Sequence, residues 1–299
     1  MLIAVAFKNT SWFIIRINFG GGIVKKRRLF WVIGSLLIGL ILLGTGVRHV
    51  TADQVSEKRA LGHTTVTLFF HGFGSSAHAE KYMVAAIRSA KKTNTVLHAN
   101  VGYFGHVTIT GKVVRHPQNP IVEVNYQNSR NGNYRQDGKW AGNVIKKLQQ
   151  EYGMKRMNLV GHSMGNMDIM FYLLERKKNS PQLVHQVSLA GHYNGIVGYS
   201  QAARSPLGRD GKPPKMDTAY KTLLGVRQRY PRGVQVLNVY GNVGNGTDGE
   251  VANVSSRSLR YLLNNRAGNY REVMIKDASH SELHHNKQVN RLLISFLFN

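Results

Sequence analysis

The stretch NLVGHSMGNM, from Asn158 to Met167, constrains the fold of this chain more than any other. A short apolar run precedes Gly161 and an apolar-periodic segment follows Gly165, which predicts a strand, a sharp turn and a helix. Glycines two residues before and two residues after Ser163 allow a bend that exposes the serine hydroxyl at the end of the strand. The alternative is a structural serine in an ordinary turn. The rest of the sequence must show whether the partners of a nucleophilic serine are present.

Strands and helices alternate along the chain after residue 60. We expect strands at 64–70, 95–101, 106–113, 119–128, 157–163, 183–191, 234–243 and 269–278, and helices at 77–92, 137–153, 164–178 and 284–298. Such alternation predicts right-handed βαβ units, and therefore a mainly parallel sheet with helices on both faces. The fold class is α/β, in one domain over residues 64–299.

The pattern loosens between Gly195 and Gly233, a segment that holds four of the seven prolines. We interpret residues 195–233 as a small lid inserted over the carboxyl edge of the sheet, where pockets of such folds lie. The alternative is a surface ornament without contact to substrate, because long loop insertions cost little free energy.

A serine nucleophile needs a base, and the base needs an acid that orients it. In folds with this bend the chain order is serine, acid, histidine. Asp248 lies in the glycine-rich loop GNGTDGE after a predicted strand, and Glu250 is the alternate acid. His280 is the first histidine after the last predicted strand, in DASHSELHHN, and His284 is its alternate.

An oxyanion needs two hydrogen-bond donors. The stretch HGFGSS follows the first strong strand, so the backbone N–H groups of Phe73 and Met164 are the expected donors. The spacing of His280 and His284 could suggest a metal site, but no carboxylate ligand is placed convincingly beside them. We therefore predict no metal and no cofactor.

The motifs HGFGSS, GHSMGN, TDGE and HSELHHN, in that order, resemble those of the α/β-hydrolase superfamily. More narrowly, they resemble a family of exported hydrolases of Gram-positive bacteria catalogued as domain of unknown function 915. The resemblance covers about Thr64 to Phe298, and it implies an α/β-hydrolase fold with esterase-like or lipase-like acyl hydrolysis. The substrate expected from it is a small or lipid-like ester.

The N-terminal region carries an export pattern. Four basic residues precede 19 uncharged residues, Leu29 to Val47, close to the roughly 20 that span a bilayer core. The basic flank predicts an extracellular domain, at the outer face of the bacterial plasma membrane or secreted. Residues 24–52 are therefore a membrane anchor or a signal cleaved after Ala52, followed by a short linker at 53–63. Residues 1–23 fit a mis-annotated start, with a true start at Val24.

The net charge of the chain indicates which partners it favours. The chain has 40 basic and 15 acidic residues, and residues 1–52 hold only seven of the basic ones. The excess therefore belongs to the folded domain, and it favours an anionic cell-wall polymer or membrane surface. No nucleic-acid-binding motif is present, so nucleic acid is not an expected partner.

Composition and motifs leave three functions open. The favoured one is a serine hydrolase that cleaves carboxylic esters through an acyl-enzyme. The alternatives are a non-catalytic surface binding protein on the same fold and an acyltransferase with the same three residues. The oligomeric state is not predicted.

Overall fold

The computed structural model describes residues 2–6, 12–16 and 60–298. Two compact units divide at residues 54 and 55. In the first unit, β1 (Leu2–Ala6) pairs antiparallel with β2 (Trp12–Arg16). The expected anchor or signal at 24–52 lies outside the described residues. Within them, no helix is both long and apolar enough to cross a membrane.

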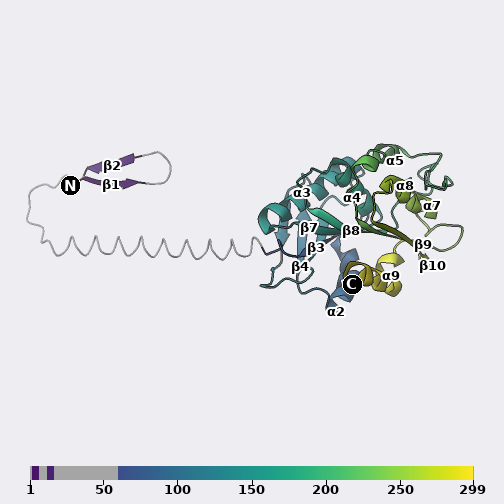
Figure 1. Ribbon diagram of the computed structural model, residues 1–299, viewed down its shortest axis with the longest axis horizontal. Helices are drawn as coiled ribbons and strands as arrows, with labels where there is room; N and C mark the ends of the chain where they lie inside the picture. The colour runs from purple at the N-terminus through teal and green to yellow at the C-terminus, as the bar shows by residue number, and fades with distance from the viewer. Residues whose placement is uncertain (1, 7–11, 17–59, 299) are drawn as a thin grey trace, which may run out of the picture. The chain divides into compact units, whose positions relative to one another are not determined.

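The second unit is built on an eight-stranded sheet in the order β10-β9-β8-β7-β3-β6-β4-β5 (Figure 1). The strands are β3 (Thr65–Phe70), β4 (Val96–Val101), β5 (Val107–Thr110), β6 (Ile121–Tyr126), β7 (Arg156–His162), β8 (Gln182–Leu189), β9 (Gln235–Asn242) and β10 (Asn269–Lys276). Only β5 is antiparallel to its neighbour, β4, and every other pair is parallel. The predicted mainly parallel sheet is confirmed.

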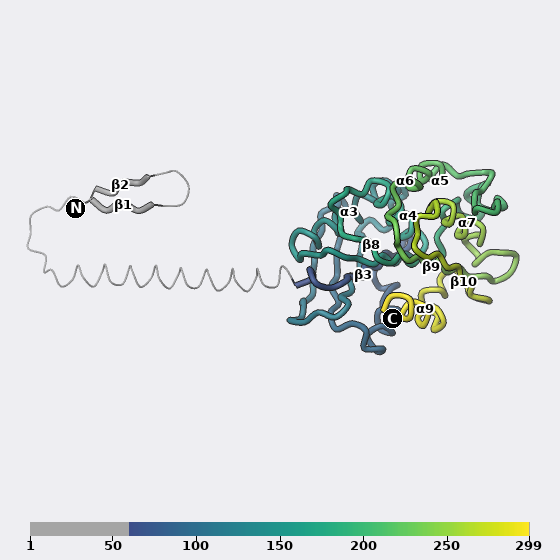
Figure 2. Tube along the Cα trace, in the orientation of Figure 1, coloured from purple at the N-terminus to yellow at the C-terminus, as the bar shows by residue number. Residues whose placement is uncertain are grey.

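Helices cover both faces of this sheet, as predicted. One face packs against α3 (Tyr134–Tyr152), α4 (Met164–Glu175), α5 (Thr218–Leu223), α6 (Val226–Arg229) and α8 (Leu259–Leu263). The other packs against α2 (Lys81–Ser89) and α9 (Lys287–Phe298). The early helix α2 and the C-terminal helix α9 are in contact, and the blue and yellow tubes of Figure 2 run on the same side of the sheet.

The chain alternates because buried parallel strands need crossover helices. In the centre, β3 is buried on both faces, and its β-branched and aromatic residues TVTLFF suit that position. From β3 the chain first builds β4, β5 and β6 on one side and then β7 to β10 on the other. Ligands of open α/β sheets bind where the strand order reverses in this way. That point is the carboxyl end of β3 and β7, at His71 and Ser163.

The structure divides two of the predicted helices and adds one that the sequence did not predict. Short helix η1 (Ala77–Glu80) lies within the helix predicted at 77–92, and η2 (Glu282–His285) overlaps the start of the one predicted at 284–298. Helix α7 (Asn253–Arg257) lies outside every predicted helix. Before β3, Leu61 is fully buried and its N–H donates to the carbonyl oxygen of Tyr152 at 3.1 Å. The packed part of the chain therefore includes residues within the expected linker.

Candidate active site

A cavity of about 530 Å³ opens at the carboxyl ends of β3 and β7. Ser163 and His280 both line it, and Asp248 is buried behind His280. The lining residues come from the loop after β3, the bend after β7, the loops after β8, β9 and β10, and the start of α3; they are Gly72, Phe73, Ser75, Gly132, Tyr134, His162, Ser163, Met164, His192, Ile196, Tyr199, Glu250, His280, Ser281 and His284. The structure thus brings candidate site residues from four separate motifs to one pocket.

Ser163 occupies a strained bend between β7 and α4. Its φ is 51° and its ψ is −118°, a backbone conformation that non-glycine residues rarely adopt. The bend needs glycine on both sides because the chain is too close for a side chain. A Cβ at Gly161 would lie 2.8 Å from the amide nitrogen of Asn166, and one at Gly165 would lie 2.1 Å from the carbonyl oxygen of Phe70.

Hydrogen bonds hold this bend in place. The N–H of Ser163 donates to the carbonyl oxygen of Leu189 at 2.9 Å, which ties the bend to β8. The side-chain amide of Asn166 donates to the carbonyl oxygens of Ser163 and Leu189, at 3.2 and 2.9 Å. The hydroxyl-bearing residue therefore sits on a backbone that is fixed from two sides.

Asp248 and His280 form a buried hydrogen-bonded pair. Asp248 Oδ2 lies 2.9 Å from His280 Nδ1, and the backbone N–H of His280 donates to the carbonyl oxygen of Asp248 at 2.8 Å. The other carboxylate oxygen, Oδ1, accepts from the N–H groups of Glu250 at 3.0 Å and Val251 at 2.7 Å. A carboxylate held in this way keeps the proton on Nδ1, so Nε2 is available as a base.

The alternates also line the pocket, but neither takes the place of Asp248 or His280. Glu250 approaches the opposite edge of the imidazole, with its Oε2 3.7 Å from His280 Nε2. His284 has no acid beside its ring, and its buried Nδ1 has no hydrogen-bond partner among the described residues. Burial is the main cause that lowers the pKa of His284 to about 4.

The two residues expected to provide oxyanion donors both line the pocket: Phe73 in the loop after β3, and Met164 as the first residue of α4. Neither the N–H of Phe73 nor that of Met164 donates to another residue in the described part of the chain. The loop is fixed by His71, whose Nδ1–H donates to the carbonyl oxygen of Gly72 at 2.9 Å. His71 Nε2 in turn accepts from the N–H of Tyr126, at the end of β6, at 3.3 Å. The ring therefore links the loop to β6.

Sequence reasoning missed two buried histidines at this site. His162 Nε2–H donates to the carbonyl oxygen of His280 at 3.0 Å, and its ring packs against those of His280 and His284. His192 Nε2 lies 3.2 Å from the hydroxyl oxygen of Tyr134. Burial lowers the pKa of His162 well below its ordinary value and that of His192 to about 4. The only sequence signal was the position of His162 directly before the serine.

The expected lid contributes little to this pocket. Of residues 195–233, only Ile196 and Tyr199 line it. The buried side chains of the later part, including Tyr220 and Tyr230, belong to the core on the α4 face of the sheet. Only the start of the segment therefore forms the pocket rim, at Ile196 and Tyr199, while its later part packs into the core and does not cover the pocket.

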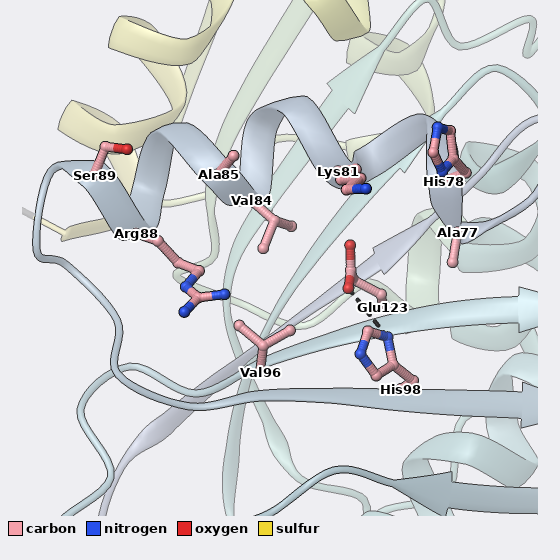
Figure 3. Close-up of a pocket in the computed structure, with 10 residues that line it drawn as sticks. All are labelled: Ala77, His78, Lys81, Val84, Ala85, Arg88, Ser89, Val96, His98 and Glu123. Carbon is pink, nitrogen blue, oxygen red and sulfur yellow. Dashed lines mark ion pairs between the residues drawn. The ribbon is translucent and has the colours of Figure 1, made fainter.

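A second cavity, of about 690 Å³, lies between α2 and strands β4 and β6. Figure 3 shows Lys81 and Arg88 on the helical side, facing Glu123 and His98 on the strands. Glu123 Oε2 lies 3.1 Å from His98 Nδ1, and Ser89 stands at the far end of α2 from this pair. No nucleophile therefore lies beside a base here. Among the described residues, no cluster of three or more His, Asp or Glu side chains could hold a metal ion.

Comparisons agree with the fold. Residues 54–299 match the family described as "Alpha/beta hydrolase of unknown function (DUF915)", so the resemblance predicted from the motifs is confirmed. A protein of Listeria innocua, the product of gene lin2722, has a crystal structure that matches with 23% identity and a TM-score of 0.70, over 78% of this chain and 94% of that one.

A second solved structure is that of the "putative cell surface hydrolase from Lactobacillus plantarum WCFS1". It is 18% identical, with a TM-score of 0.62, over 78% of this chain and 89% of that one. At these identities both structures support the fold alone. Among curated proteins, none matches this chain.

Proposed function

This chain belongs to the DUF915 family of alpha/beta hydrolases, and from that premise we propose that it is a serine hydrolase that cleaves carboxylic esters. One observation carries the proposal: Asp248 holds His280 by its Nδ1 at 2.9 Å in the pocket where Ser163 occupies its strained bend. Three such residues in this chain order are the machinery of acyl transfer through a serine.

The reaction follows from these positions. The Ser163 hydroxyl attacks the ester carbonyl and its proton passes to His280 Nε2. The N–H groups of Phe73 and Met164 stabilise the negative charge that develops on the carbonyl oxygen. The protonated histidine then donates its proton to the departing alcohol, which leaves Ser163 acylated. Water attacks the acyl-enzyme by the same route, releasing the acid and restoring the serine.

The surroundings of His280 support a role as a base. Burial keeps its neighbours His162, His192 and His284 uncharged at neutral pH, because it lowers the pKa of each. No neighbouring imidazolium therefore opposes the charge that His280 gains when it accepts the serine proton. The buried carboxylate of Asp248 stabilises that charge.

Hydrolysis of short p-nitrophenyl esters by the full chain tests the proposal. We expect Ser163→Ala and His280→Ala each to lower kcat by at least about 10³-fold, because the residues act as a unit. A matched control, His285→Ala, alters a histidine that does not line the pocket and should retain activity. A Ser163→Ala variant as active as the unmodified protein would exclude Ser163 as the nucleophile.

The proposed place of action is outside the cell, at the plasma membrane or after secretion, near an anionic wall polymer or membrane surface. The basic cluster ahead of residues 29–47 and the excess of basic residues in the folded part support this. Protease treatment of intact cells tests it. An extracellular domain is degraded while a cytoplasmic marker is spared, and a chain that survives with the marker contradicts an external location.

A further inference from the structure

Glu250 is a pocket residue that the proposed reaction leaves without a role. Asp248 already occupies the Nδ1 edge of His280, so a second orienting acid is not needed. Glu250 lies on the Nε2 edge instead, with its carboxylate 3.7 Å from the nitrogen that exchanges protons with serine and leaving group. Its side chain is 66% exposed, so the carboxylate retains solvent and stays open to a ligand.

The backbone of Glu250 is fixed although its side chain is exposed. Its N–H donates to Asp248 Oδ1 at 3.0 Å, and its carbonyl oxygen accepts from the N–H of Val197 at 3.0 Å. The first bond ties Glu250 to Asp248, the orienting acid, and the second ties it to the rim segment that contains Ile196 and Tyr199. The backbone of Glu250 is thus fixed at the pocket rim, and its side chain reaches from there to 3.7 Å from His280 Nε2.

The charge of the pocket is opposite to that of the molecule. No lysine, arginine or aspartate lines the pocket in the described structure, and its buried histidines His162 and His192 are uncharged at neutral pH. Glu250 is therefore the lining carboxylate of a chain with a net charge of +25. The guanidinium of Arg130 lies 6.0 Å from the ring centre of Phe73, but Arg130 does not line the pocket.

A carboxylate next to the scissile bond favours a cation at that place and disfavours an anion. We propose that Glu250 selects esters that carry an ammonium group within a few bonds of the scissile carbonyl. This inference rests on the proposed esterase function and names its substrate class. The ammonium is bound and not transformed, so the proton transfers between Ser163 and His280 are unchanged. The cation can belong to the acyl part, as in an aminoacyl ester, or to the alcohol part, as in an amino alcohol ester.

Two matched substrate pairs test the selection and distinguish these sources. The alanine and isobutyrate esters of 4-methylumbelliferone differ on the acyl side by an ammonium in place of a methyl group. Acetylcholine and 3,3-dimethylbutyl acetate differ in charge on the alcohol side. For each pair, the ratio of kcat/KM for the charged to the neutral ester is measured in the full chain and in Glu250→Gln. Comparing ratios between variants cancels the intrinsic reactivity of each ester.

We expect Glu250→Gln to lower the ratio about threefold to fivefold for the pair whose cation meets Glu250, as for loss of a solvent-screened charge pair. Glu175→Gln, an exposed glutamate on α4 outside the pocket, should leave both ratios unchanged. Ratios that Glu250→Gln does not move, while neutral esters are cleaved, overturn the inference and leave the esterase proposal standing. Absence of cleavage of every ester overturns the esterase proposal itself.

Discussion

The backbone of Ser163 is held in a strained conformation that the proposed chemistry requires. A φ of 51° at a residue with a side chain costs about 1–3 kcal/mol, and it persists only where the surroundings enforce it. Here the enforcement comes from close packing, since Gly165 brings α4 against the end of β3. The strain exposes the hydroxyl and directs the first amides of α4 towards the same space.

Gly165→Ala should therefore destabilise the fold. The added Cβ would lie 2.1 Å from the carbonyl oxygen of Phe70, so α4 or β3 has to shift. We expect a loss of about 2–4 kcal/mol in the free energy of unfolding in urea. Gly132→Ala is the matched control because a Cβ there meets nothing within 4 Å. Equal stability of the two variants would contradict the close approach.

Asp248→Asn tests the orienting acid. The asparagine retains the shape but can present an N–H to His280, which favours the wrong tautomer. We expect kcat for ester hydrolysis to fall at least about 10²-fold, but less than for loss of Ser163 or His280, with stability nearly unchanged. Steady-state kinetics and urea unfolding measure the two effects separately. Activity within tenfold of the unmodified protein would remove Asp248 from this role.

At the scale of elements, the sequence predicted best those helices and strands whose own residue pattern is enough to specify them. Strand β3 follows from its β-branched and aromatic run and lies where we predicted it. Helix α3 follows from the periodicity of its apolar residues and begins at Tyr134, three residues before its predicted start. The short helices α7 and α8 escaped prediction because their stability is tertiary. Leu259 and Leu262 are buried in the core beside α6, and the hydroxyl of Tyr220 donates to the carbonyl oxygen of Ser258.

The segment 195–233 shows the same limit. Its composition indicated a loop over the pocket, but composition does not reveal which apolar residues face the pocket and which face the core. Leu223 and Tyr230 are fully buried on the α4 face, whereas Tyr199 is 91% exposed at the pocket rim. Replacing the whole segment with a glycine linker would therefore remove core residues, and point substitutions are the sharper test.

Tyr199→Ala should alter the preference for acyl-chain length. The ring offers apolar surface at the rim, so its loss should lower kcat/KM about fivefold for octanoate esters and less for acetate esters. Phe104→Ala is the matched control, because Phe104 is a fully exposed aromatic residue that does not line the pocket. A profile from acetate to octanoate that matches the control would show that the rim does not contact the acyl chain.

At the scale of the whole molecule, the motifs predicted candidate residues that the fold brings to one pocket, but not the buried histidines that contact them from distant parts of the chain. Ser163, Asp248 and His280 stand in recognisable local patterns. His162 could not be assigned, because its partner, the carbonyl oxygen of His280, lies 118 residues away along the chain. His192 belongs to no motif, and only burial and its contact with Tyr134 define its state.

His192 also makes stability depend on pH. Burial lowers its pKa from 6.5 to about 4, so the unfolded chain binds a proton below about pH 6.5 that the folded chain excludes until about pH 4. This histidine should destabilise the fold progressively as pH falls through that range, by about 3 kcal/mol in full. Above pH 6.5 it has no such effect.

The test is the difference between His192→Gln and the unmodified protein in urea unfolding at several pH values. A difference is needed because burial raises the pKa of Glu80 to about 8 and that of Asp137 to about 6, which favours the folded state at low pH. We expect the variant to lose less stability than the unmodified protein between pH 6.5 and 4. His106→Gln, at an exposed histidine, should not change the slope.

Covalent labelling by a fluorophosphonate tests the central claim most directly. The reagent phosphonylates a serine only when a base activates it and donors hold the new oxyanion, so it reports the whole site at once. We predict that the full chain gains the mass of one label, that peptide mapping assigns the label to Ser163, and that Ser163→Ala gains none. An unlabelled folded chain, or a label on another residue, would contradict the account.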